Sequence, residues 1–178
     1  TRMVGEARVA GMLSGKCGRV VIHLGGSPTG FKPLHDVLSH SDIPRSQFIP
    51  THVNRTRTLL NEALDWCKDG GYIDITAGIN PEKGASKGVK ASKAIVDCLE
   101  QKLDLAKVCL SSDGNGSLPV FDTEGNMVRL GVAGFDCLLS EFKDMVQQEG
   151  IPLTDALRPL TSSPAACLGL SDRKGRIA

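Results

Sequence analysis

Apolar and polar positions along the chain follow a pattern that predicts short strands separated by helices. Four brief apolar runs rich in β-branched residues predict strands at residues 19–24, 46–52, 72–76 and 107–111. Continuous apolar runs of this length are typical of strands buried on both faces of a parallel sheet. Pro50 is expected to end the second strand early, because proline lacks the N–H that a sheet ladder uses.

Helical spacing of apolar residues fills the intervals between these runs. It predicts helices at residues 33–40, 59–69, 91–99 and 135–146, and a last helical stretch at 154–160 that is punctuated by Pro159 and Pro164. Gly70 and Gly71 end the second of these helices. Residues 78–88 form a polar, glycine-containing stretch that predicts a loop.

Strands that alternate with helices indicate an α/β fold with a parallel sheet. Two architectures remain open at this point, an open doubly wound sheet and a (β/α)8 barrel, of which four strand-helix units would form one half. The pattern by itself slightly favours the open sheet. No internal repeat divides the chain, so residues 1–178 are expected to form one domain or a large piece of one.

Composition narrows the function classes. The chain is 40% apolar and 23% charged, which is typical of globular proteins and argues against disorder. A net charge of +1 and an aromatic content of 4% offer nucleic acid no attraction, and no apolar run approaches the roughly 20 residues of a membrane helix. Six scattered cysteines without a C-x-x-C pair favour free thiols in a cytoplasmic protein.

Three residues with metal-binding side chains stand where predicted strands end, namely His23, His52 and Asp113. Functional groups gather at these ends in parallel α/β folds, and imidazole and carboxylate are ligands for zinc. Each has an ordinary alternative: a histidine after a strand is often structural, and Asp113 lies in a Ser-Ser-Asp-Gly-Asn-Gly-Ser stretch that favours a turn. Their shared position at three of four strand ends favours a common metal site.

Other chemically interesting residues carry weaker signals. His35 and His40 lie on a predicted helix and at its end, where exposure to solvent is expected. The loop 25–30 is rich in glycine but lacks the Gly-Lys-Ser/Thr ending of a phosphate-binding loop. Asp74 lies inside a strand as a core-facing or structural residue, and Cys109 has no basic neighbour in sequence to activate it.

Several segments together carry a family resemblance. They are VVIHLGG, PTHVNR, GGYIDIT, LSSDGNGSLPVFD and ALRPLTSSPA, in this order. The chain resembles the isoaspartyl (β-aspartyl) dipeptidases of the amidohydrolase superfamily over nearly its whole length, with PTHVNR and SSDGNGS the most specific pieces. The resemblance implies a (β/α)8 TIM barrel with two zinc ions at its mouth, of which this chain is roughly the C-terminal half.

The resemblance also implies roles for individual residues. His23 and His52 would be ligands to one zinc ion, and Asp113 would be a ligand to the other and the catalytic carrier of the proton. Arg55 would bind a substrate carboxylate, and Ser117 would bind the substrate through its hydroxyl. The implied reaction is hydrolysis of a β-aspartyl dipeptide by a hydroxide that the metal ions activate.

Departures from the family pattern leave alternatives open. The chain has no His-x-His pair, no metal-bridging lysine and no small β domain, so it is expected to be a piece of a longer protein. A dihydroorotase-like or hydantoinase-like activity and an inactive truncated module are the alternatives. A half-barrel exposes two sheet edges, so the 178-residue chain alone is expected to associate and to be inactive. For the intact protein, the resemblance implies a homo-oligomer.

Overall fold

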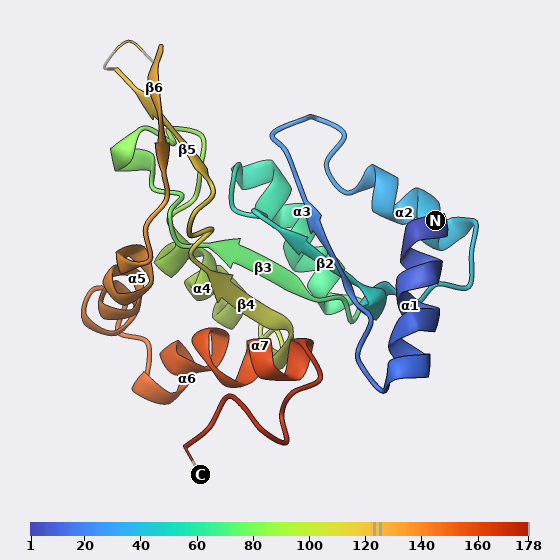
Figure 1. The fold of residues 1–178 in the computed structure, drawn as a ribbon. Helices are drawn as coiled ribbons and strands as arrows, with labels where there is room; N and C mark the ends of the chain where they lie inside the picture. The colour runs from blue at the N-terminus through green and yellow to red at the C-terminus, as the bar shows by residue number, and fades with distance from the viewer. Residues whose placement is uncertain (123, 125, 178) are drawn as a thin grey trace.

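A computed structural model describes residues 1–122, 124 and 126–177. Its centre is a parallel sheet of four strands, β1 (Val20–His23), β2 (Phe48–Thr51), β3 (Ile73–Thr76) and β4 (Val108–Ser111). The strands lie side by side in sequence order (Figure 1). All four expected strands are confirmed. An open doubly wound sheet reverses its strand order at a switch point, whereas the order here advances in one direction, as it does in the wall of a barrel.

Helices follow the strands as the apolar spacing predicted. They are α2 (Lys32–Ser39), α3 (Arg57–Lys68), α4 (Ala91–Glu100) and α5 (Asp136–Gln147). The Thr56 side chain caps α3 by accepting a hydrogen bond from the Leu59 N–H. The expected last stretch is present as α6 (Leu153–Leu157), a 3₁₀ turn (Arg158–Leu160) and α7 (Ser162–Cys167). No helix in the described part of the chain is long and apolar enough to cross a membrane.

The sheet has an apolar outer face that packs against the helices. Phe48, Ile73, Ile75 and Val108 point to this side and are almost completely buried. The side chains that meet them come chiefly from α3 and α4, including Leu60, Leu64, Trp66, Ala94 and Ile95. Residues at alternate positions of the same strands point to the opposite, inner face. That face carries the polar side chains of Thr51, Asp74 and Ser111, together with the exposed Val21 and a small cluster in which Ile49 and Cys109 pack against Cys167.

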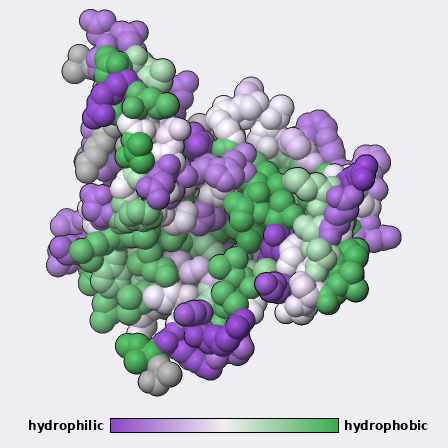
Figure 2. All heavy atoms as spheres, viewed as in Figure 1, coloured by the Kyte–Doolittle hydropathy of each residue, from purple (hydrophilic) through white to green (hydrophobic). Residues whose placement is uncertain are grey.

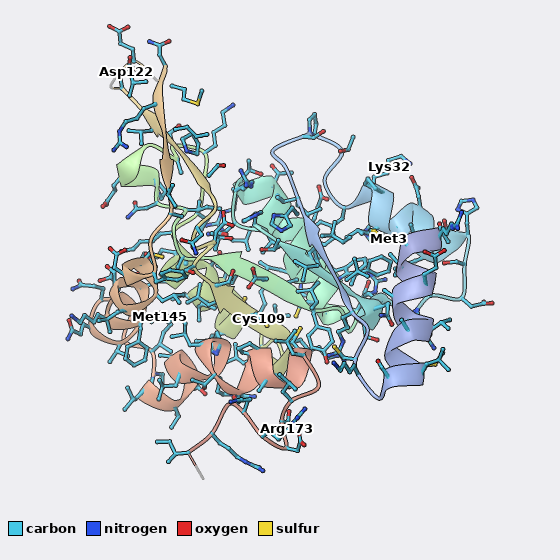
Figure 3. The ribbon with its side chains drawn as sticks, in the orientation of Figure 1. Met3, Lys32, Cys109, Asp122, Met145 and Arg173 are labelled. Carbon is cyan, nitrogen blue, oxygen red and sulfur yellow. The ribbon has the colours of Figure 1, made fainter. Side chains whose placement is uncertain are left out.

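Helix α7 covers part of the inner face next to β4. Cys109 of β4 (Figure 3) packs against Cys167 of α7. Ser163 of α7 donates a hydrogen bond to the Leu105 carbonyl across 2.6 Å. Arg19, the residue before β1, donates hydrogen bonds to the carbonyls of Ala166 and Cys167 at the C-terminal end of this helix. All six cysteines have free thiols, as the sequence predicted.

Three features differ from expectation. The prediction that Pro50 ends its strand early is wrong, because β2 continues to Thr51 and Pro50 is paired with Ile22 of β1. Pairing with β1 covers all four positions of β2, which holds the strand in place despite the missing N–H. Helix α1 (Arg2–Ser14) was not predicted, because its apolar residues do not form a single stripe and most of them are exposed.

The third difference is a hairpin of β5 (Ser117–Phe121) and β6 (Met127–Val132), which projects from the body of the molecule (Figure 1) with Asp122 at its far end (Figure 3). No strand is predicted here, because the apolar residues Met127 and Val128 are adjacent instead of alternating with polar residues, and both are exposed in the structure. Figure 2 shows further apolar surface over α5 and α6, where Leu139 and Leu153 are exposed.

Candidate active site

His23, His52 and Asp113 come together at the C-terminal ends of the strands. His23 is the last residue of β1, His52 follows β2, and Asp113 follows β4. The His23 Nδ1 and His52 Nε2 atoms are 3.0 Å apart, and an Asp113 carboxylate oxygen lies 4.0 Å from the same His52 nitrogen. All three line a cavity of about 260 Å³ on the inner face of the sheet. Their role as metal ligands stays a prediction.

His52 is held by its backbone and by its other ring nitrogen. It has a φ of 64°, a left-handed conformation that is uncommon for a residue other than glycine, and its carbonyl accepts a hydrogen bond from the Arg55 N–H. Its Nδ1 is 2.8 Å from the Thr76 hydroxyl, which leaves Nε2 facing His23. Burial and the positive charge of Arg55 lower the pKa of His52 despite the opposing effect of Asp113, so the imidazole is neutral near pH 7.

Asp113 forms the turn that its sequence allowed, and its role as a metal ligand stays a prediction. Its φ is 54°, and its carbonyl accepts a hydrogen bond from the Gly116 N–H, so the residue does form a turn. Its carboxylate nonetheless points toward His52. A Cβ on Gly116 would lie 2.8 Å from both the carbonyl and a carboxylate oxygen of Asp113, so only glycine leaves the turn undistorted.

A larger cavity of about 580 Å³ opens above the site. His52 and Asp113 form part of its lining, together with Arg55 from the turn after β2 and Ser117 from the start of β5. The structure therefore brings the predicted substrate-binding residues to the same cavity as two of the predicted metal ligands. Another wall of this cavity is the loop after β3, including Lys87, which no sequence pattern singled out.

Asp74 belongs to the floor of the site rather than to the apolar core. Its side chain lies on the inner face, and one carboxylate oxygen accepts hydrogen bonds from the hydroxyls of Thr51 and Ser111, the latter across 2.7 Å. Burial raises the pKa of Asp74, although both hydroxyls oppose this effect. The alternation in Ile73-Asp74-Ile75 was the signal that could have placed it opposite the core.

His35, His40 and Cys109, the weaker candidates for a functional role, lie where the sequence predicted them, on the surface or in a strand. His35 and His40 are exposed, and the His35 ring packs against Trp66 with the ring centres 5.6 Å apart. Cys109 is buried, and its contact with Cys167 and its burial raise the pKa of its thiol, so it is not an activated nucleophile.

The described residues do not contain a complete metal site. Within residues 1–122, 124 and 126–177, no group of three or more His, Cys, Asp or Glu side chains is placed to hold an ion by itself. The imidazole pair is nevertheless close to metal-binding geometry, since two nitrogens bound to one tetrahedral zinc ion lie about 3.3 Å apart. The hydroxyl beside His52 Nδ1 also matches the usual arrangement, in which the second nitrogen of a metal-binding histidine is hydrogen-bonded.

Comparison with known proteins identifies the class. A sequence model of the amidohydrolase family matches residues 47–178, and the chain belongs to this family. Two solved structures of β-aspartyl dipeptidase from Fervidobacterium islandicum AW-1 resemble it over 99% of its length. One, in complex with the β-Asp-Leu dipeptide, is 38% identical with a TM-score of 0.85. The other is 32% identical with a TM-score of 0.81.

These similarities confirm the resemblance to β-aspartyl dipeptidases and the α/β fold expected of a partial TIM barrel. The chain covers 45% and 42% of the two dipeptidase chains, so it spans less than half of their length.

Proposed function

We propose that the protein hydrolyses β-aspartyl dipeptides with a water molecule activated by bound divalent metal, most simply zinc. The observation that carries the proposal is the meeting of His23, His52 and Asp113 beside a cavity that also contains Arg55 and Ser117. The similarity to a dipeptidase in complex with β-Asp-Leu supports this choice of substrate.

The donor set fits a divalent metal. His23 and His52 present imidazole nitrogens 3.0 Å apart, Asp113 presents a carboxylate oxygen, and zinc binds both kinds of atom. Further ligands would come from outside these residues, as the two-zinc site implied by the family requires. When bound, the metal would lower the pKa of a water molecule toward neutrality and polarise the scissile carbonyl.

Asp113 is the residue for proton transfer. Its side chain is 32% exposed and accepts no hydrogen bond from the described residues, so a carboxylate oxygen is available to take a proton from the attacking water. The same group then returns the proton to the nitrogen of the leaving amine. The glycine turn around it restricts where the carboxylate can lie, which keeps the acceptor beside the nucleophile.

Arg55 and Ser117 account for substrate binding. A β-aspartyl dipeptide carries two carboxylates, and a guanidinium can bind one of them through two parallel hydrogen bonds. Among the described residues Arg55 makes no ion pair, so its charge is available to a ligand in the cavity. The Ser117 hydroxyl, at the first residue of β5, supplies a neutral hydrogen-bonding group to the same cavity.

The test is hydrolysis of β-Asp-Leu by the natural protein, with α-Asp-Leu as the competing substrate. We expect cleavage of the β-linked dipeptide to be strongly preferred, to be lost after removal of metal with a chelator, and to return when zinc is added. Equal cleavage of both dipeptides, or full activity in metal-free protein, would contradict the proposal. A His35→Ala variant, which changes an exposed histidine outside the site, serves as the control.

A further inference from the structure

Asn54 lies in the turn that carries the candidate metal ligand His52 and the candidate substrate-binding residue Arg55. It is the third residue of the four-residue turn that begins at His52 and ends at Arg55, and it is fully buried. Its side-chain nitrogen donates to the carbonyls of Thr76, at 3.0 Å, and Val89, at 2.8 Å. Its side-chain oxygen accepts from the Thr76 N–H at 2.9 Å.

These hydrogen bonds connect two parts of the site. Thr76 ends β3, and its hydroxyl is the group that faces His52 Nδ1. Val89 lies at the far end of the loop whose residues 84–88 form a wall of the large cavity. The backbone of Asn54 adds a second bond there, since its carbonyl accepts from the Val89 N–H at 2.9 Å. One residue thus fixes both the end of β3 and the end of the wall.

A carboxamide is suited to this position because it has two N–H donors and an acceptor oxygen on one short side chain. Aspartate has the same shape but no donors, so it would place an acceptor against the Thr76 and Val89 carbonyls. An apolar side chain would leave three buried backbone groups without partners, which proteins rarely tolerate. Among the described residues, no other side chain bonds to both Thr76 and Val89.

We propose that Asn54 is a positioning residue, which holds the Arg55 turn and the wall of residues 84–88 at the spacing the substrate needs. This inference rests on the proposed function, since it concerns the same cavity. Asn54 does not line that cavity and acts through Arg55, Thr76 and the wall. Its loss therefore affects substrate binding more than the chemical step.

The test is Asn54→Asp in the natural protein, with Gln47→Glu as the matched control. Gln47 is also a buried amide whose nitrogen donates to a backbone carbonyl, that of Gly18, but it lies before β2 and outside both cavities. We expect Asn54→Asp to raise the KM for β-Asp-Leu by about tenfold or more while kcat changes much less. Gln47→Glu should lower stability without changing KM.

Hydrogen exchange gives a second measurement that needs no substrate. In Asn54→Asp the amides of residues 84–89 should exchange faster, because the bond to the Val89 carbonyl is lost. The Thr76 amide should stay protected, since a carboxylate still accepts its hydrogen bond. Asn54→Ser serves if the aspartate variant does not fold. Equal KM in Asn54 and Gln47 variants, or unchanged exchange at 84–89, would overturn the inference.

The two proposals can fail separately. If the unmodified protein does not cleave β-Asp-Leu, the proposed function is wrong, and exchange at residues 84–89 still decides whether Asn54 holds the wall. If the unmodified protein cleaves the dipeptide and the Asn54 variants keep its KM, only the positioning role is wrong.

Discussion

The two faces of the four-stranded sheet are built from the same strands and do different things. On the outer face Ile73 and Ile75 are completely buried against helices. Between them Asp74 points the other way and accepts hydrogen bonds from hydroxyls of the neighbouring strands. The outer face stabilises the fold through apolar burial that depends on volume and shape. The inner face depends on individual donors and acceptors, so single atoms matter there.

Substitutions on the inner face should therefore affect activity, and substitutions on the outer face should affect stability. An outer-face residue contacts the site only through the strand that carries it. An inner-face residue near the strand ends contacts the site directly, as Thr76 contacts His52.

The largest effect is expected for Asp113→Asn. Asparagine tolerates the left-handed backbone of this position as well as aspartate does, but it cannot accept the proton of the attacking water. We expect kcat/KM for β-Asp-Leu to fall by roughly 10³-fold or more, about 4 kcal/mol of transition-state stabilisation. The midpoint of urea unfolding should barely move. Asp36→Asn, an exposed residue of α2, is the control, and equal activity in the two variants would count against the proton-transfer role.

An effect of the opposite kind, on stability and not on activity, is expected for Ile75→Ala on the outer face. The side chain is completely buried, so its truncation should lower the free energy of unfolding by roughly 2–5 kcal/mol. The folded variant should keep the KM of the unmodified protein, because the change leaves the inner face intact. Urea denaturation and steady-state kinetics measure the two quantities. A large change in KM with unchanged stability would break the proposed division between the faces.

Arg55→Lys should have a moderate effect confined to substrate binding. Lysine keeps the positive charge but loses the two parallel hydrogen bonds to a carboxylate. We expect KM for β-Asp-Leu to rise by about 10-fold to 100-fold, or 1.4 to 2.7 kcal/mol, with a smaller change in kcat. Arg57→Lys provides the comparison, since Arg57 is two residues away and is paired with Asp97. Indistinguishable KM values for the two variants would exclude a binding role for Arg55.

The smallest effect is expected on the pH dependence of stability, for a substitution of Glu141 on the outer side of the sheet. This buried carboxylate on α5 accepts a hydrogen bond from the Ser92 N–H at 2.8 Å, and burial raises its pKa. The pKa of Glu141 is higher in the folded chain than in the unfolded chain, so protonation of this carboxyl group stabilises the folded chain. This contribution to the free energy of unfolding is fully present below about pH 4.3. That contribution is lost as the pH rises through the folded-state value.

Glu141→Gln should therefore remove part of the pH dependence of unfolding just above pH 4.3, since glutamine does not titrate but can still accept the Ser92 bond. Urea midpoints measured from pH 4 to 7 for both proteins give the comparison. Parallel curves would show that Glu141 titrates alike in the folded and unfolded chain.

The sequence was sufficient to predict the four alternating strands and helices of the fold. Burial of apolar residues at helical and strand spacing produced the four strands and the helices after them, because that spacing reports directly on the core. The prediction that Pro50 ends the second strand was wrong, because all four residues of β2 are paired with β1 and the strand continues past the proline. The hairpin after Ser117 was not predicted, because the apolar residues Met127, Val128 and Leu130 of its second strand are all exposed and follow no burial pattern.

The candidate site divides in the same way. His23, His52 and Asp113 could be proposed from their places at strand ends, and Arg55 and Ser117 from the family resemblance. Asn54 and Thr76 could not, because their importance lies in hydrogen bonds between segments 22 residues apart in sequence. Such contacts carry no local signal until the strands are placed side by side.

The central claim is that His23, His52 and Asp113 bind divalent metal together, and metal analysis of the purified natural protein tests it most directly. We predict bound zinc or a similar divalent ion in the unmodified protein and in His40→Ala, an exposed histidine, and at least one equivalent less in both His23→Ala and His52→Ala. Metal content that is the same in all four proteins, or absent from the unmodified protein after addition of zinc, would contradict the account.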